Sequence, residues 1–167
     1  RMQELILDRA IELGCAPTVI NEAAENLSIL SRFDYAFSVN VMEHVDDVET
    51  SIRNVARSLK PGAIYHFTCP NYLFPYESHF NIPIVVNKKL TGKIFSSVIF
   101  GASSAPDASG LWDSINWISV IELRRIAKST PSLTMLFGKR QFSEIMERVI
   151  SDAEFARRRP KWMRLGI

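Results

Sequence analysis

Residues 33–63 begin with the apolar run Phe33-Asp34-Tyr35-Ala36-Phe37-Ser38-Val39 and end with Leu59-Lys60-Pro61-Gly62-Ala63. The first run is short and rich in aromatic residues, which is typical of a β-strand. Asp46 or Asp47 is then placed to cap a helix, where acidic side chains favour the positive end of the helix dipole. Four apolar residues of this helix share one face, because they step by four, three and four positions: Val48, Ile52, Val55 and Leu59.

The helix is followed by a turn and a second strand. Lys60-Pro61-Gly62 predicts the end of the helix, with Gly62 supplying the positive φ that a tight turn needs. Residues 63–69 are apolar and aromatic and stop at Pro70, so they are predicted to form a strand. Strand, helix and strand with short connections indicate a βαβ unit with parallel strands.

Further elements are predicted on both sides of this unit. The spacing of apolar residues predicts a helix over 2–13, and Ala16-Pro17-Thr18-Val19-Ile20 is predicted to be a short strand. Ser119 and Glu122 form a capping box that starts another helix. Residues 132–137 are a possible strand, and a last helix with a basic end follows. The fold class is therefore α/β.

Composition excludes several classes of protein. The 167 residues are 47% hydrophobic, 23% charged and 10% aromatic, which is unlike a disordered chain, a collagen or a disulfide miniprotein. No stretch reaches the roughly 18 apolar residues of a spanning helix. Cys15 and Cys69 are far apart and form no metal-binding spacing, which favours a reducing compartment and predicts a cytoplasmic location.

Charge gives little support for a nucleic-acid partner. The net charge is +2, although residues 139–167 hold eight Lys or Arg against four Asp or Glu. This excess is small beside a nucleic-acid footprint, so the basic end is interpreted as a solvated face or a docking surface. A membrane-surface contact through residues 88–100 and the basic end is the weaker alternative.

Residues 33–63 resemble the class I S-adenosylmethionine-dependent methyltransferases. In that family a strand opening with Phe-Asp leads to a Leu-Glu-His-Val-like segment, a helix and a Lys-Pro-Gly-Gly turn. Here the segment reads Met42-Glu43-His44-Val45, and Ala63 replaces the second glycine of the turn. The resemblance covers roughly residues 2–130 and implies a Rossmann-like methyltransferase sheet with an aromatic-rich insertion.

The resemblance also implies a cofactor site for S-adenosylmethionine. Glu22 and Ala23 stand where the family places an acidic-Ala pair near the adenine, and Ser38, Val39 and Asn40 end the strand that begins at Phe33. Ligands of open α/β sheets lie at these carboxyl ends. Val39 would then offer an apolar wall and Asn40 a polar tip.

A small-molecule acceptor is the predicted partner, and residues 71–118 are its predicted lid. Methyl transfer to an oxygen nucleophile also needs a base, for which His44 and His79 are the candidates. The predicted acceptor-binding residues come from the lid: Tyr72, Tyr76, Trp112 and Asn116.

Structural roles are the alternative for each of these residues. His44 is as well explained by a structural hydrogen bond, and the aromatic residues by packing. Glu77 and His79 suit a metal ion, but two ligands without a third make no site, so no metal is predicted.

The family's glycine-rich cofactor loop has no counterpart among residues 1–167, whose glycines lie at 14, 62, 92, 101, 110, 138 and 166. We therefore expect a fragment of a methyltransferase that by itself binds the cofactor weakly or not at all. Residues 1–70 would be the C-terminal part of the cofactor-binding core, 71–118 the lid, and 119–167 a helix, the possible strand and the basic helix. The alternative is a non-catalytic interaction module that retains the βαβ scaffold.

Overall fold

The computed structural model describes residues 2–101 and 107–157. The chain divides into two compact units. Unit 1 comprises Arg1–Ala36 and Asp47–Tyr65, and unit 2 comprises Phe37–Asp46 and His66–Ile167.

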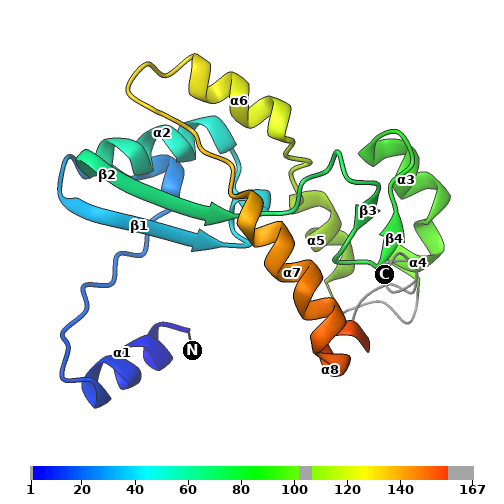
Figure 1. The fold of residues 1–167 in the computed structure, drawn as a ribbon, viewed down its shortest axis with the longest axis horizontal. Helices are drawn as coiled ribbons and strands as arrows, with labels where there is room; N and C mark the ends of the chain where they lie inside the picture. Colours follow the sequence, from blue (N-terminus) through cyan, green and yellow to red (C-terminus); the bar gives the residue numbers. More distant parts are fainter. Residues whose placement is uncertain (1, 102–106, 158–167) are drawn as a thin grey trace. The chain divides into compact units, whose positions relative to one another are not determined.

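The predicted βαβ unit is confirmed. β1 (Phe33–Val39) and β2 (Leu59–Thr68) are hydrogen-bonded neighbours in a sheet, and their arrows run in the same direction (Figure 1). α2 (Val48–Ser58) connects them, as a parallel pair requires. β2 begins at Leu59, four residues before the predicted start, so the predictions of Leu59 in the helix and of a tight turn at residues 60–62 are wrong. Gly62 nevertheless has the predicted positive φ, at +82°.

α2 forms where the sequence places it. The Asp47 carboxylate accepts a hydrogen bond from the Thr50 N–H at 2.9 Å, which caps the helix and lowers the pKa of Asp47. Val48, Ile52 and Leu59 are buried, and Val55 is half-buried. The predicted apolar face is therefore the buried face.

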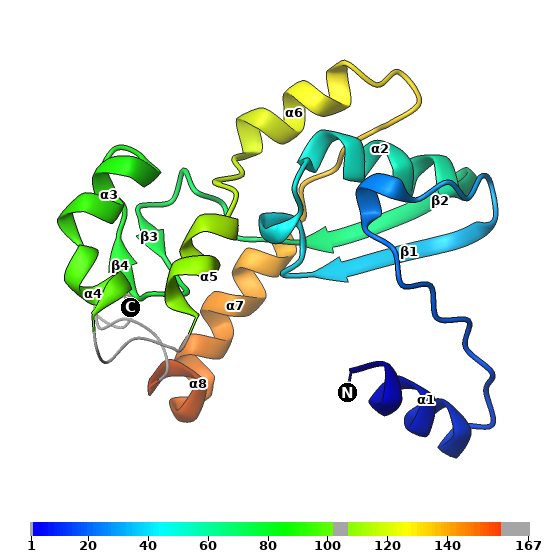
Figure 2. The ribbon, with the colours of Figure 1, turned by 180° about the vertical axis from the view of Figure 1, so that it is seen from behind.

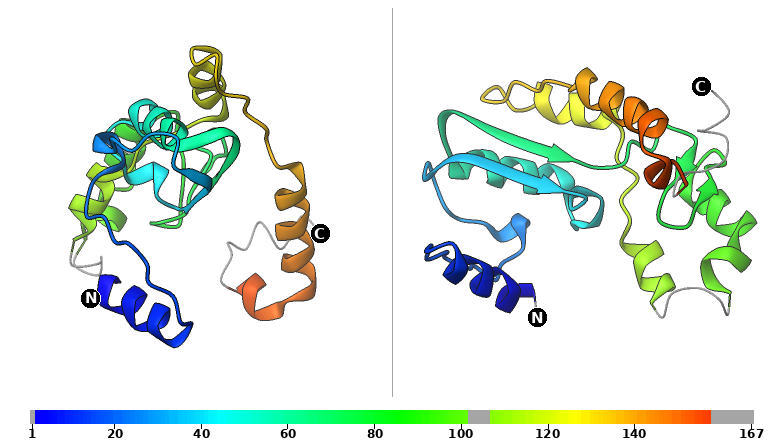
Figure 3. Two further views of the ribbon diagram at one scale, coloured as in Figure 1. Left: turned by 90° about the vertical axis from the view of Figure 1, so that its left-hand side faces the viewer. Right: turned by 60° about the horizontal axis from the view of Figure 1, so that its bottom comes forward.

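Two predicted strands are absent. Residues 16–20 lie in exposed chain between α1 (Met2–Glu12) and η1 (Ala24–Asn26), and residues 132–137 form no strand either (Figure 3). A strand is stable only when a neighbour completes its hydrogen-bond ladder, and the β1–β2 sheet has two strands among the described residues. Both predictions of a strand are therefore wrong for this structure.

A hairpin and three short helices lie within residues 76–101 and 107–114, the centre of the predicted lid. β3 (Tyr76–Glu77) pairs antiparallel with β4 (Ile82–Pro83). α3 (Lys88–Ile94), α4 (Ser96–Phe100) and α5 (Ala108–Ser114) lie around this hairpin (Figure 2). Ile82, Ile99 and Trp112 form a buried apolar cluster, against which Phe80, Phe95 and Trp117 pack.

Three helices follow in the chain. α6 (Val120–Lys128) begins at Ser119, whose hydroxyl accepts a hydrogen bond from the Glu122 N–H at 3.2 Å. α7 (Lys139–Ser151) and α8 (Ala153–Arg157) complete the described chain, so residues 158–161 of the predicted basic end lie outside it. None of the helices in the described part of the chain has the length and apolar character needed to cross a membrane.

Candidate functional site

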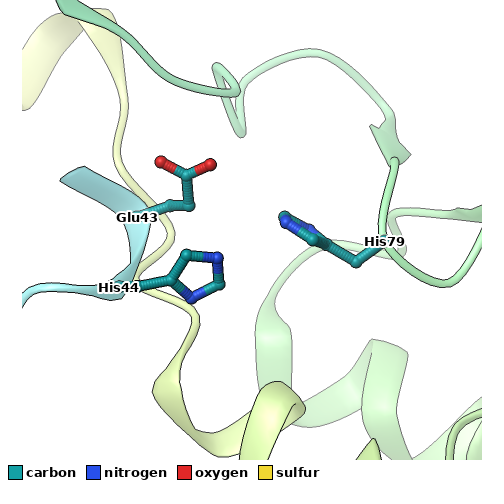
Figure 4. Close-up of side chains that lie close together, drawn as sticks. All are labelled: Glu43, His44 and His79. Atoms are coloured by element: carbon teal, nitrogen blue, oxygen red, sulfur yellow. The ribbon is translucent and has the colours of Figure 1, made fainter. Parts of the chain in front are cut away.

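Two segments of unit 2 bring three chemically active side chains together. Glu43 and His44 lie on η2 (Met42–His44), which follows β1, and His79 lies in the turn between β3 and β4. One ligand atom from each side chain lies within 4.8 Å of the others (Figure 4). We call Glu43, His44 and His79 the Glu-His-His cluster.

Glu43 is the buried member of the cluster. Its side chain has no solvent exposure, and neither carboxylate oxygen has a hydrogen-bond partner among the described residues. Leaving a buried polar group unpaired costs about 1–3 kcal/mol, and more for a charged one. Such a group calls for a physical explanation.

His79 is held by a second buried carboxylate. Its Nδ1 lies 2.6 Å from Oε1 of Glu77, which also accepts from the His79 N–H at 3.1 Å. The Phe80 N–H donates to the other oxygen at 2.8 Å. Burial raises the pKa of Glu77, but the hydrogen bonds that Glu77 accepts have the larger combined effect, so its pKa is lowered. For His79, the hydrogen bond to Glu77 raises the pKa and outweighs the lowering effect of burial.

His44 is oriented by Ser114 of α5. Its Nδ1 lies 3.2 Å from the Ser114 hydroxyl oxygen, and that hydroxyl donates its proton to the Leu111 carbonyl at 2.9 Å. The hydroxyl oxygen therefore accepts from His44 Nδ1–H, which leaves the lone pair of the neutral ring on Nε2. The rings of His44 and His79 meet edge to face with centroids 5.3 Å apart.

Asn116 supports the cluster through the main chain. Its N–H donates to the Glu43 carbonyl at 2.6 Å, and its side-chain amide donates to the Val45 carbonyl. Asn116 therefore holds the segment that carries Glu43 and His44.

The charge of Glu43 also acts on its neighbours. Burial, assisted by this carboxylate, raises the pKa of the Cys69 thiol to about 11. Burial raises the pKa of Tyr72 as well, with Glu77 and Glu43 adding to the effect. Cys69 is therefore a neutral thiol near neutral pH and a poor nucleophile.

The predicted cofactor residues lie in different units. Ser38, Val39 and Asn40 end β1 in unit 2, with Val39 exposed. Asn40 has φ +53°, a left-handed conformation that asparagine tolerates better than most residues, and its N–H donates to the Thr68 carbonyl at 2.9 Å. Glu22 and Ala23 are exposed residues of unit 1, just before η1.

Comparison with known proteins finds a family match for this βαβ region. Residues 2–67 match the family model of the methyltransferase domain, a class I S-adenosylmethionine-dependent family. The resemblance seen in the sequence is confirmed over residues 2–67, and its extension to about residue 130 stays a prediction.

Two relatives come from Mycobacterium tuberculosis: uncharacterized protein MT1557 of strain CDC 1551 / Oshkosh and uncharacterized protein Rv1509 of strain ATCC 25618 / H37Rv. Each is 45% identical over 161 residues, which are 96% of this chain and 55% of the relative. The chain thus spans about half the length of these curated relatives. No solved structure matches it significantly.

The four predicted acceptor-binding residues differ in their burial and contacts. Trp112 is buried in the apolar cluster, and Tyr72 is buried and stacked on Trp117 with ring centroids 5.2 Å apart. The Tyr76 hydroxyl donates to the Asn81 side-chain carbonyl at 2.7 Å. Packing thus accounts for Trp112 and Tyr72, and the binding roles of all four residues stay predictions.

Sequence reasoning missed Glu43 as a site residue and found no third partner for Glu77 and His79. The structure places Glu43 and His44, and not Glu77, beside His79 as candidate ligands, because η2 lies close to the β3–β4 turn. The available signal was the neighbouring pair Glu43-His44 together with the Glu77-x-His79 spacing. Nothing in these two patterns shows that they meet in space.

Proposed function

We propose that the protein transfers a methyl group from S-adenosylmethionine to a small-molecule acceptor. The observation that carries this proposal is the methyltransferase-domain match over residues 2–67, which include β1, α2 and β2. Glu43, the first residue of the Glu-His-His cluster, comes four residues after the end of β1. Ligands of α/β proteins bind at the carboxyl ends of the strands.

The residues at the end of β1 suit the adenosine part of the cofactor. Val39 is an exposed apolar side chain, and Asn40 beside it carries an amide that both donates and accepts hydrogen bonds. Glu22 and Ala23 keep the adenine-binding role that the family resemblance implies, and Ser38 precedes Val39 on β1. S-adenosylmethionine supplies an activated methyl group, so the protein mainly has to align the acceptor and exclude water.

On the acceptor side, His44 and His79 are the proposed proton acceptors. Neutral His44 donates from Nδ1 to Ser114, so its lone pair is on Nε2. This nitrogen can accept a proton. The proposed lid, residues 71–118, exposes apolar side chains at Ile94, Val98 and Phe100, which favour an amphipathic acceptor. Lys88 in this region donates to the carbonyls of Asp113 and Ile115, so its ammonium group is engaged within the protein.

The test is calorimetric titration with S-adenosylhomocysteine of the intact polypeptide that carries residues 1–167. Val39→Asp should abolish binding, because it places an unpaired charge against the adenosine. Ile121→Asp is the matched control, since Ile121 is an equally exposed apolar residue on α6 and should bind like the parent. Equal affinity of both variants would contradict this placement, and no binding by the parent would favour the non-catalytic module.

A further inference from the structure

We propose that the Glu-His-His cluster binds one divalent ion of a first-row transition metal such as zinc or cobalt. This inference rests on the geometry of unit 2 and not on the proposed methyl transfer. Glu43 would supply one carboxylate oxygen, and His44 and His79 would each supply Nε2.

The first argument is that Glu43 is buried without a hydrogen-bond partner among the described residues. Among the described residues of unit 2, two carboxylates are completely buried, Glu43 and Glu77. Glu77 accepts hydrogen bonds from the main chain at His79 and Phe80 and from the His79 ring, whereas Glu43 has no partner for either oxygen among the described residues. A buried charge persists in proteins when it is paired or bound to a metal. The two imidazoles beside Glu43 make a metal ion the fitting partner.

The orientation of both imidazoles is the second argument. Each ring has its Nδ1 occupied, by Glu77 in His79 and by Ser114 in His44. A ring that donates from Nδ1 keeps its Nε2 lone pair for a metal. Histidine ligands commonly have such a partner on the other nitrogen, and a carboxylate there makes the ligand more basic. Glu77 is thus a positioning residue for His79.

The donor atoms select the class of metal. Two imidazoles and one carboxylate are the set found in catalytic zinc sites and in iron sites with open positions. Calcium and magnesium prefer oxygen ligands alone. Atoms bound to one zinc at about 2.0–2.1 Å lie about 3–4 Å apart, so metal binding would require the present separations of up to 4.8 Å to shorten by about 1 Å.

The same Nε2 atoms are the proposed proton acceptors of methyl transfer, and one lone pair serves one role at a time. A bound metal would therefore make both histidines ligands, and an acceptor oxygen would occupy an open position on the ion. Metal titration without any methyl donor separates the two roles and leaves the test of methyl transfer independent.

The experiment is calorimetric titration of the full chain, freed of metal with a chelator, with zinc chloride and then with cobalt chloride. We expect one ion per chain. Glu43→Gln and His79→Gln should each weaken binding by more than about tenfold. His66→Gln is the matched control, because His66 is an exposed histidine on β2 outside the cluster and its loss should leave the affinity unchanged.

A second measurement separates a ligand from a merely structural residue. Without metal, Glu43→Gln should not lower the melting temperature, because the Glu43 side chain makes no hydrogen bond among the described residues that the substitution would remove. Zinc should raise the melting temperature of the parent and of His66→Gln but not that of Glu43→Gln. Zinc affinity in Glu43→Gln equal to that of the parent, or an equal loss in His66→Gln, would overturn the proposal.

Discussion

Glu43 and Glu77 are both buried glutamates, but they differ in the hydrogen-bond donors around their carboxylates. Main-chain and imidazole donors surround Glu77, which lowers its pKa and makes it part of the scaffold. Glu43 lacks such donors among the described residues, and its charge acts instead on His79, Cys69 and Tyr72. An unpaired buried charge is expensive for stability, which favours a role in binding over a role in folding.

Cys69 gives a prediction about pH. With a pKa of about 11, only about one Cys69 thiol in a thousand is ionised at pH 8, and the thiolate is the reactive form. Iodoacetamide at pH 8 should therefore modify exposed Cys15 while Cys69 resists, and each added pH unit should speed labelling of Cys69 about tenfold.

Mass spectrometry of the two cysteine peptides measures both rates. Denaturant is the control, since unfolding should remove the difference between the thiols. Equal labelling of Cys15 and Cys69 in the folded protein at pH 8 would contradict the burial of Cys69.

Helices and strands were predictable where the signal is local. The Asp47 cap, the apolar face of α2 and the positive φ of Gly62 are properties of a few consecutive residues, and the structure confirms them. Residues 16–20 and 132–137 have suitable strand composition, but composition does not supply a neighbouring strand. β1 and β2 themselves were predictable because α2 connects them at the length that a crossover needs.

The lid region contains a small apolar core, and Trp112 of α5 is its largest member. Trp112 packs with Ile82 and Ile99, edge to face with the Phe80 ring, whose centroid is 5.6 Å away. Trp112→Ala should lower the free energy of unfolding by about 3–5 kcal/mol, the usual effect of emptying such a site. Phe100→Ala, at a half-exposed position on α4, should cost less than about 1 kcal/mol.

Urea unfolding of both variants measures the difference. Similar losses for Trp112→Ala and Phe100→Ala would mean that this apolar cluster does not stabilise the region. Retained stability together with lost acceptor binding would instead support the predicted acceptor-binding role of Trp112.

Across the whole chain, the candidate site was only partly predictable. His44 and His79 were recognised as reactive groups, but they are 35 positions apart and their contact depends on how η2 meets the β3–β4 turn. Glu43 gave no signal of its own, because its distinguishing property is burial without a partner. The resemblance to the methyltransferase family, in contrast, rests on a continuous stretch of sequence, and the family match over residues 2–67 supports it there.

The proposed methyl donor site at the end of β1 is tested most directly by ultraviolet cross-linking. S-adenosylmethionine with a labelled methyl group would be cross-linked to the intact polypeptide, which is then digested with trypsin. Cleavage after Arg32 and Arg53 releases the peptide Phe33–Arg53, which contains Ser38, Val39 and Asn40. We predict label in this peptide that excess S-adenosylhomocysteine removes. Displaceable label confined to peptides that contain none of the proposed cofactor residues, or label that S-adenosylhomocysteine does not displace, would contradict the proposed site.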